Sequence, residues 1–191
     1  MAAAGQLGGS QAGVRLRYDL GFGLALAARL SGPLRERRGK EAAVALDWRP
    51  LGALPVTFTI ERRAGLDRGG RDAFAAGVFG GFDRLTLPLG FSTEGYAQAG
   101  VVGLKRRDLY ADGALRVERK LAGAGRVRIG VGAGLWGGAQ PGMSRLDAGP
   151  QIVAHAPLGP ASVRIGAEWR TRIAGNARPG SGPALTIGAD F

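Results

Sequence analysis

Cysteine is absent from the 191 residues of this chain, and His155 is its single histidine. Without cysteine the chain can form neither a disulfide framework nor a thiolate metal site. A single histidine excludes a metal centre built from several imidazoles. We therefore expect no metal and no cofactor, and the sequence predicts no catalytic residue.

Long apolar runs are also absent. Hydrophobic residues make up 45% of the chain, yet no stretch reaches the ~18 uncharged apolar residues that a membrane-spanning helix requires. Residues 1–10 lack the basic start and the apolar centre of about 7–15 residues that mark a secretory signal. This N-terminal sequence is consistent with three cases: a protein whose signal has been removed, the C-terminal piece of a longer protein, or a cytosolic protein.

Lysine is scarce and arginine abundant. Lysine occurs only at Lys40, Lys105 and Lys120, whereas 26 basic residues stand against 15 acidic ones, a net charge of +11. Such a charge is typical of nucleic-acid-binding proteins. Here, however, arginine recurs at every second position of strand-like runs and does not cluster beside aromatics on a helix. We expect no nucleic-acid partner.

The chain is rich in glycine, at 35 residues, and in alternation of apolar with polar residues. Alternation predicts strands, because successive side chains of a strand point to opposite faces. Eleven strands are predicted, over residues 12–20, 22–30, 41–49, 56–63, 71–82, 87–103, 109–120, 126–136, 146–156, 163–172 and 181–191. Trp48, Trp169 and Tyr18 suit an aromatic girdle at a membrane boundary.

The strands and their connections favour an outer-membrane barrel over a soluble sandwich. Each strand is near the length of about 9–11 residues that crosses a bilayer when tilted. Connections alternate in length, as in such barrels, with long ones predicted at 31–40, 63–71, 137–145 and 175–183 and short ones at 20–21, 50–55, 122–125 and 157–161.

Barrels of one chain usually have an even number of strands. We therefore predict a single domain over residues 1–191, an all-β antiparallel up-and-down transmembrane β-barrel. It would have 12 strands, the twelfth built from residues 4–10 or from sequence that precedes this chain.

The inward face of this barrel would carry charges of both signs. Arginine and carboxylate side chains pair well across neighbouring strands, because the guanidinium group offers two parallel donors. The residues predicted to form this charge network of the lumen are Asp112, Arg116, Glu118, Arg126, Arg128, Arg164, Glu168 and Arg170. Both an ion-paired filling and a selective anion path are consistent with this composition.

Two sequence motifs match functional patterns but lack the structural context that those patterns require. Residues 132–137 match the dinucleotide pattern G-x-G-x-x-G, but they lie inside an alternating strand that no helix follows. His155 could serve a hydrolase only with a nearby nucleophile, and no serine stands two residues away. We expect an inward-facing, hydrogen-bonded histidine.

A resemblance is carried by Trp48-Arg-Pro-Leu-Gly-Ala-Leu-Pro-Val-Thr-Phe-Thr-Ile-Glu-Arg-Arg63 and by the final strand. These stretches resemble the C-terminal barrels of bacterial outer-membrane proteins related to phage-adsorption receptors and cellulose-export porins. In that group the barrel serves as a polysaccharide exit or as a receptor. The aromatic end at Phe191 also resembles the signal by which such proteins reach the barrel-assembly machinery.

The expected function is that of a non-enzymatic barrel in the bacterial outer membrane, acting as a narrow pore, a receptor or a membrane anchor for a partner assembly. Its expected partners are outer-membrane lipid, including the phosphates of lipopolysaccharide, the barrel-assembly machinery and other subunits of an envelope complex. A lipid-modifying barrel enzyme and a soluble β-sandwich binding module are the alternatives.

Overall fold

The computed structural model describes residues 11–34, 39–104, 107–159 and 161–190. They form one sheet of eleven antiparallel strands, in which each strand pairs with the next along the chain. The strands are β1 (Gln11–Gly21), β2 (Leu24–Pro33), β3 (Glu41–Trp48), β4 (Val56–Gly65), β5 (Ala73–Thr86), β6 (Phe91–Val102), β7 (Asp108–Ala124), β8 (Val127–Gln140), β9 (Met143–Leu158), β10 (Ala161–Gly175) and β11 (Gly182–Asp190).

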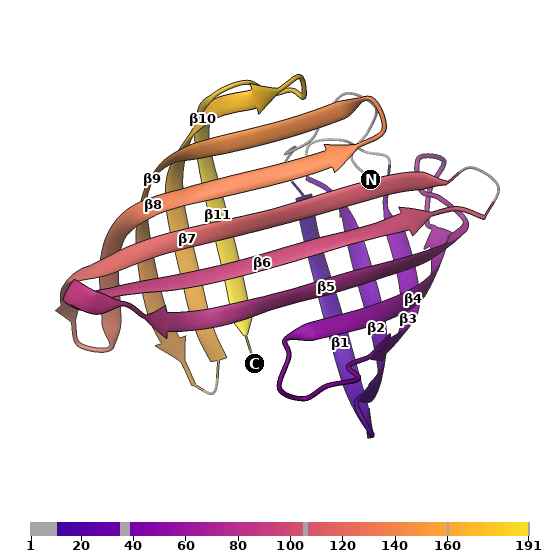
Figure 1. Cartoon of the computed structure of the whole chain (residues 1–191), viewed down its shortest axis with the longest axis horizontal. Helices are drawn as coiled ribbons and strands as arrows, with labels where there is room; N and C mark the ends of the chain where they lie inside the picture. The colour runs from indigo at the N-terminus through magenta and orange to yellow at the C-terminus, as the bar shows by residue number, and fades with distance from the viewer. Residues whose placement is uncertain (1–10, 35–38, 105–106, 160, 191) are drawn as a thin grey trace.

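The sheet curls strongly, so that β5–β8 cross the front of the view in Figure 1 while β1 and β11 lie behind them. Within the described ranges the outer edges of β1 and β11 have no strand partner, and the sheet is therefore not closed. The predicted all-β fold and the up-and-down order of eleven strands are confirmed. The predicted twelfth strand, at residues 4–10, and Phe191 lie outside the described residues.

One short 3-10 helix, η1 (Pro88–Gly90), precedes β6. No helix in the described part of the chain is both long enough and apolar enough to span a membrane.

Several predicted boundaries are wrong, and three of the errors lie at segments that contain glycine. The second strand begins at Leu24 because Phe22 and Gly23 form the turn with positive φ angles of 53° and 76°. Arg126 lies in the turn after Gly125 and not in a strand. The long sixth strand begins only at Phe91, since η1 occupies the residues before it.

The largest error concerns the long connection predicted at 137–145. β8 and β9 extend into this segment and leave only Pro141 and Gly142 between them. Gly142 has a φ of 78°, which glycine adopts without the steric cost that other residues meet. A two-residue turn is therefore sufficient, and the regular alternation of short and long connections is broken at this point.

The two faces of the sheet differ sharply in polarity. On the outer face large apolar side chains are exposed, among them Leu16 at 69%, Tyr18 at 72% and Ile187 at 69%. On the inner face Asp47 and Asp147 have no exposed surface. This distribution is the reverse of that in a water-soluble protein, in which apolar side chains are buried and carboxylates are solvated.

The connections β2–β3 and β4–β5 are joined by Asp67. Its carboxylate accepts hydrogen bonds from the backbone N–H groups of Gly39 at 2.7 Å, Lys40 at 3.1 Å and Gly69 at 2.8 Å. Because these bonds stabilise the charged form, they lower the pKa of Asp67 from 3.8 to about 2. The carboxylate thus fixes one end of the sheet.

We predict that a carboxyl carbon titration of Asp67 by NMR will have its midpoint near pH 2. The lowered pKa means that the stabilisation from this carboxylate is fully present above pH 3.8 and is lost as the pH falls through about 2. A midpoint near 3.8 would show that the backbone N–H groups do not hold the carboxylate in solution.

Candidate functional site

Buried charged side chains gather on the inner face in two groups. We name Arg15, Arg29, Glu41, Asp47, Glu61 and Arg63 the N-terminal cluster and Glu94, Arg116, Arg164, Glu168 and Arg170 the C-terminal cluster. The N-terminal cluster draws its side chains from the neighbouring strands β1–β4, whereas the C-terminal cluster connects β6 and β7 with β10. Within each strand the members lie at alternate positions, because only every second residue points inward.

The N-terminal cluster pairs each carboxylate with arginine. Arg15 Nη2 donates to both carboxylate oxygens of Asp47, at 2.7 Å each. Arg29 donates to the two oxygens of Glu61 at 3.0 and 3.3 Å, and Arg63 donates to the same carboxylate. Charge-assisted bonds of this kind are about twice as strong as neutral ones, and they compensate buried charges for the loss of water.

The arginines reach their partners by crossing small residues. Arg15 lies directly opposite Arg29 in the β1–β2 pair, a repulsive arrangement if the side chains stayed there. Asp47 lies on β3, beyond Ala25 and Ala27 of β2, which are buried at 0% and 5% exposure. These methyl groups leave room for the Arg15 side chain to pass over β2.

The C-terminal cluster centres on two glutamates. The guanidinium groups of Arg116 and Arg164 lie 3.4 and 3.3 Å from the same oxygen, Oε1 of Glu94. Glu168 accepts two hydrogen bonds from Arg170, at 2.6 and 2.9 Å, and lies 3.8 Å from Arg116 Nε. Arg116 therefore links the two carboxylates.

Trp136 and Gln151 complete this region. The Arg170 guanidinium lies 4.6 Å from the centre of the Trp136 ring, within the range of a cation–π contact. Gln151 Oε1 accepts a hydrogen bond of 3.2 Å from Arg164. Gly134 makes the position of the indole possible, because a Cβ there would lie 2.3 Å from the ring.

Two further groups extend the charged face. Asp147 is held by Arg145, its neighbour at i−2, and by Arg172 Nε at 2.7 Å. His155 Nε2 lies 3.0 Å from a carboxylate oxygen of Glu118, and its Nδ1 lies 3.4 Å from Arg84. Both groups are part of the polar filling of the inner face.

The structure brings together some of the predicted network and separates the rest. Arg116, Arg164, Glu168 and Arg170 meet in the C-terminal cluster, while Glu118 pairs with His155 and Asp112 accepts a 2.8 Å bond from Tyr96. Arg126, in a turn, and Arg128, at the start of β8, are exposed, and no ion pair among the described residues includes them.

Sequence reasoning missed Arg84 and Arg145 as members of the charged face. The position of Arg145 could have been predicted, because it precedes Asp147 by two residues and therefore lies on the same face of the strand as Asp147. The position of Arg84 could not have been predicted from alternation, because Arg84 has a φ of 39° and lies at an irregularity of the β5–β6 pair.

Within the described ranges, no group of three or more His, Asp or Glu side chains could hold a metal ion. The hydrogen bonds of His155 among these residues go to Glu118 and Arg84 and not to a serine hydroxyl. The expectation of a hydrogen-bonded histidine describes this geometry, and the assignment as a non-enzyme stays a prediction.

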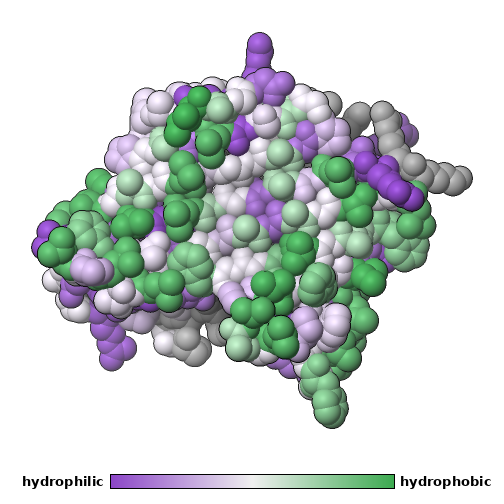
Figure 2. All heavy atoms as spheres, in the orientation of Figure 1, coloured by the Kyte–Doolittle hydropathy of each residue, from purple (hydrophilic) through white to green (hydrophobic). Residues whose placement is uncertain are grey.

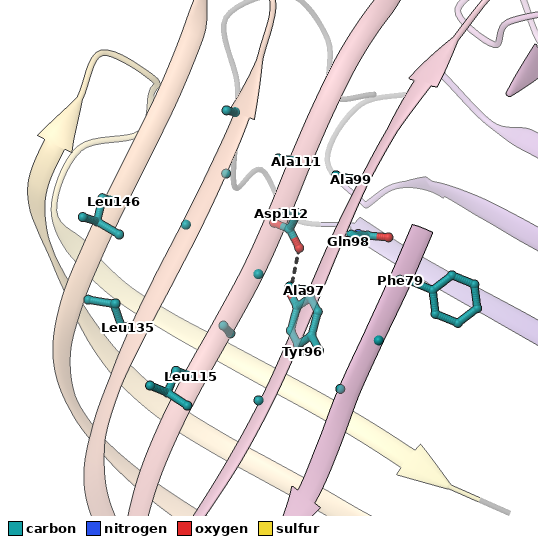
Figure 3. Close-up of a pocket in the computed structure, with 18 of the residues that line it drawn as sticks. Phe79, Tyr96, Ala97, Gln98, Ala99, Ala111, Asp112, Leu115, Leu135 and Leu146 are labelled. Carbon is teal, nitrogen blue, oxygen red and sulfur yellow. Dashed lines mark hydrogen bonds between the residues drawn. The ribbon is translucent and has the colours of Figure 1, made fainter. Parts of the chain in front are cut away.

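The outer face has a broad hollow of about 1020 Å³ with an apolar lining. A row of small residues crosses it, because Gly80, Ala97, Gly113 and Gly137 lie opposite one another on β5–β8. Leu115, Leu135 and Leu146 border this row in Figure 3. In Figure 2 the centre of the same face is mostly pale with a small purple patch, and green residues gather toward its sides.

Comparisons with known proteins add no relative. No family model matches the chain, and neither the curated proteins nor the solved structures contain a match.

We predict that Arg15→Met lowers the free energy of unfolding by about 3–5 kcal/mol, because it leaves the buried Asp47 carboxylate without its partner. Urea unfolding of the folded protein, followed by tryptophan fluorescence, measures this loss. Arg17→Met on the same strand is the control, since its pair with Asp19 is exposed and worth about 0–1 kcal/mol.

The double variant Arg15→Met/Asp47→Leu should recover most of the loss, because it removes both charges together. Equal losses in Arg15→Met and Arg17→Met, or no recovery in the double variant, would contradict a buried ion pair as the source of this stability.

Proposed function

We propose that this chain forms a non-enzymatic β-barrel of the bacterial outer membrane, with a narrow lumen filled by ion-paired side chains. In that role it serves as a narrow pore, a receptor or a membrane anchor for a partner assembly. Outer-membrane lipid surrounds it, and the barrel-assembly machinery inserts it.

The observation that supports this proposal most strongly is the polarity of the two faces. Fully buried Asp47 and Asp147 lie on the inner face, while the outer face exposes large apolar side chains on β1–β5 and β7–β11. In water, an apolar surface of this extent would drive association. In a bilayer it is matched to the acyl chains, and the polar face is kept away from lipid.

The curl of the sheet supports closure. Unpaired backbone groups at the free edges of β1 and β11 would each cost several kcal/mol in hydrocarbon. A membrane-embedded sheet must therefore pair these edges, either directly or through a twelfth strand. The proposed barrel places that strand between β11 and β1.

A soluble sandwich and a lipid-modifying enzyme are less well supported. A sandwich needs a second sheet to cover the apolar face, and the described residues form one sheet only. An enzyme needs a nucleophile near its base, and among the described residues His155 is bonded to Glu118 and Arg84.

The three tryptophans provide a test of membrane insertion. Trp48 and Trp169 are 49% and 52% exposed on the outer face, whereas Trp136 is 5% exposed on the inner face. We prepare three variants that each keep one tryptophan and replace the other two by phenylalanine, and we fold each into vesicles. Lipids brominated on their acyl chains should strongly quench Trp48 and Trp169 and leave Trp136 nearly unchanged.

Electrophoresis provides the control for folding, since a closed barrel in detergent changes its migration when it is boiled. Equal quenching of all three tryptophans, or migration that boiling does not alter, would refute the barrel. Single-channel recording in planar bilayers then separates a conducting pore from a closed membrane anchor.

A further inference from the structure

We propose that one end of the sheet carries a binding surface for the headgroups of anionic phospholipids, which we name the basic turn patch. It combines the connection between β5 and β6 with the end of β7 and the turn that leads to β8. The patch consists of Leu87, Leu89, Phe91, Arg119, Lys120, Leu121, Arg126, Val127 and Arg128. This inference rests on the proposed membrane role and assigns the class of lipid that this end of the chain contacts.

The two parts of the patch lie side by side. β6 pairs with β7, and Phe91, the first residue of β6, lies opposite Arg119. Figure 1 shows both connections at the left end of the sheet. The guanidinium group of Arg119 lies 5.7 Å from the centre of the Phe91 ring, so positive charge and apolar surface are in direct contact.

The leucines of the patch are exposed. Leu89 is 82% exposed, Leu121 64% and Leu87 37%. Leu89 also has a φ of 62°, a left-handed conformation that leucine adopts only at an energetic cost. Connections that face water are usually built from glycine, proline and small polar residues. These exposed leucines therefore indicate a surface that meets an apolar medium.

The basic residues of the patch have no counter-ion within it. Residues 85–91 and 119–131 together contain four basic residues and no Asp or Glu. All four basic side chains are exposed, and no ion pair among the described residues includes them. Of the adjoining carboxylates, that of Glu118 is engaged by His155, which leaves Asp83. The patch therefore has an excess of positive charge.

The combination of charge and apolar surface favours anionic lipid over other polyanions. Guanidinium and ammonium groups bind phosphate oxygens, and anionic headgroups attract basic residues at a membrane surface. The exposed leucines beside these charges suit the boundary between headgroups and acyl chains. Single-stranded nucleic acid instead requires free aromatic rings on which bases stack, and the ring of Phe91 already lies against Arg119.

The connection between β3 and β4 provides the contrast at the same end of the sheet. Leu51 is 58% exposed there, but Arg49 is the one basic residue of the segment 49–55. The Arg49 guanidinium donates to the carbonyl oxygens of Gly52 and Leu54, at 3.0 Å each. This connection has exposed leucines without a cluster of basic groups, so we expect a much weaker preference for anionic lipid.

The absence of cysteine allows a single probe to be placed at either connection. We introduce Ala122→Cys or Ala53→Cys, both at exposed positions, into the full chain. The thiol is labelled with a nitrobenzoxadiazole fluorophore, and the protein is folded into phosphatidylcholine vesicles. These contain an equal small fraction of spin-labelled phosphatidylglycerol, which is anionic, or of spin-labelled phosphatidylcholine, which has no net charge. Quenching of the fluorophore by each lipid measures the local concentration of that lipid.

The anionic lipid should be enriched around the Ala122→Cys probe by roughly tenfold or more, because each basic residue at a membrane surface gives about a fivefold preference and four act together. Around the Ala53→Cys probe the enrichment should be about fivefold at most. Salt at about 1 M should remove most of the enrichment at both probes, because the Debye length then falls to about 3 Å.

Matched variants then identify the residues. Arg126→Gln/Arg128→Gln should lower the enrichment around the Ala122→Cys probe severalfold. Arg68→Gln/Arg107→Gln removes two exposed arginines at the opposite end of the sheet and should leave this enrichment unchanged. Migration with and without boiling shows whether each variant is folded. The salt dependence of the parent chain tests the proposal without any change of charge in the protein.

Equal quenching of the Ala122→Cys probe by the two lipids would overturn the lipid site, as would an enrichment that Arg126→Gln/Arg128→Gln or salt leaves intact. An acidic protein surface would then be the remaining partner for this charge. Quenching of neither probe by either lipid would mean that the chain does not enter the membrane, and it would overturn the membrane role as well. The failure of the lipid site alone is therefore distinguishable from the failure of both.

Discussion

The structure depends on the cost of taking carboxylates out of water. Asp47 and Asp147 have no exposed surface, and an ion moved from water into a protein interior loses several kcal/mol of solvation. Each is therefore held by arginine, and the arginines need small residues such as Ala25 and Ala27 beneath their side chains. The inner face carries this polar filling, and the large apolar residues are exposed on the outer face. The same requirement thus explains the small residues that lie beneath the arginine side chains.

Alternation allowed the strands and their facing to be predicted, because the period of two is a local property of an extended chain. Pairing partners could not be predicted in this way. Pairing between adjacent strands places Arg15 opposite Arg29, whereas the carboxylate that binds Arg15 belongs to Asp47 on β3, two strands away. A long side chain can cross a strand of alanines, and that route is visible only once the sheet has its register.

Glycine explains where the prediction of the connections failed. Residues 137–145 contain glycines that read as a loop, yet Gly137 and Gly138 lie in β8, and only Pro141 and Gly142 turn the chain. Glycine is common both in turns and where a sheet surface needs room, so composition does not separate the two uses. The hydrogen bond from Arg164 to Gln151 could not be predicted for a related reason, because the acceptor that a buried N–H group finds depends on the assembled side chains and not on their order.

The reach of arginine across strands has a consequence for how such a chain can evolve. Arg15 and Asp47 are 32 positions apart, as are Arg29 and Glu61. Loss of Arg15 leaves Asp47 as an uncompensated buried ion, and loss of Glu61 leaves Arg29 without its carboxylate partner, so these positions do not change independently. Among descendants of this sequence, substitutions at these paired positions should therefore be correlated. The correlated positions would connect β1 with β3 and β2 with β4. They would follow the path of the side chains across the sheet and not the backbone hydrogen bonds between adjacent strands.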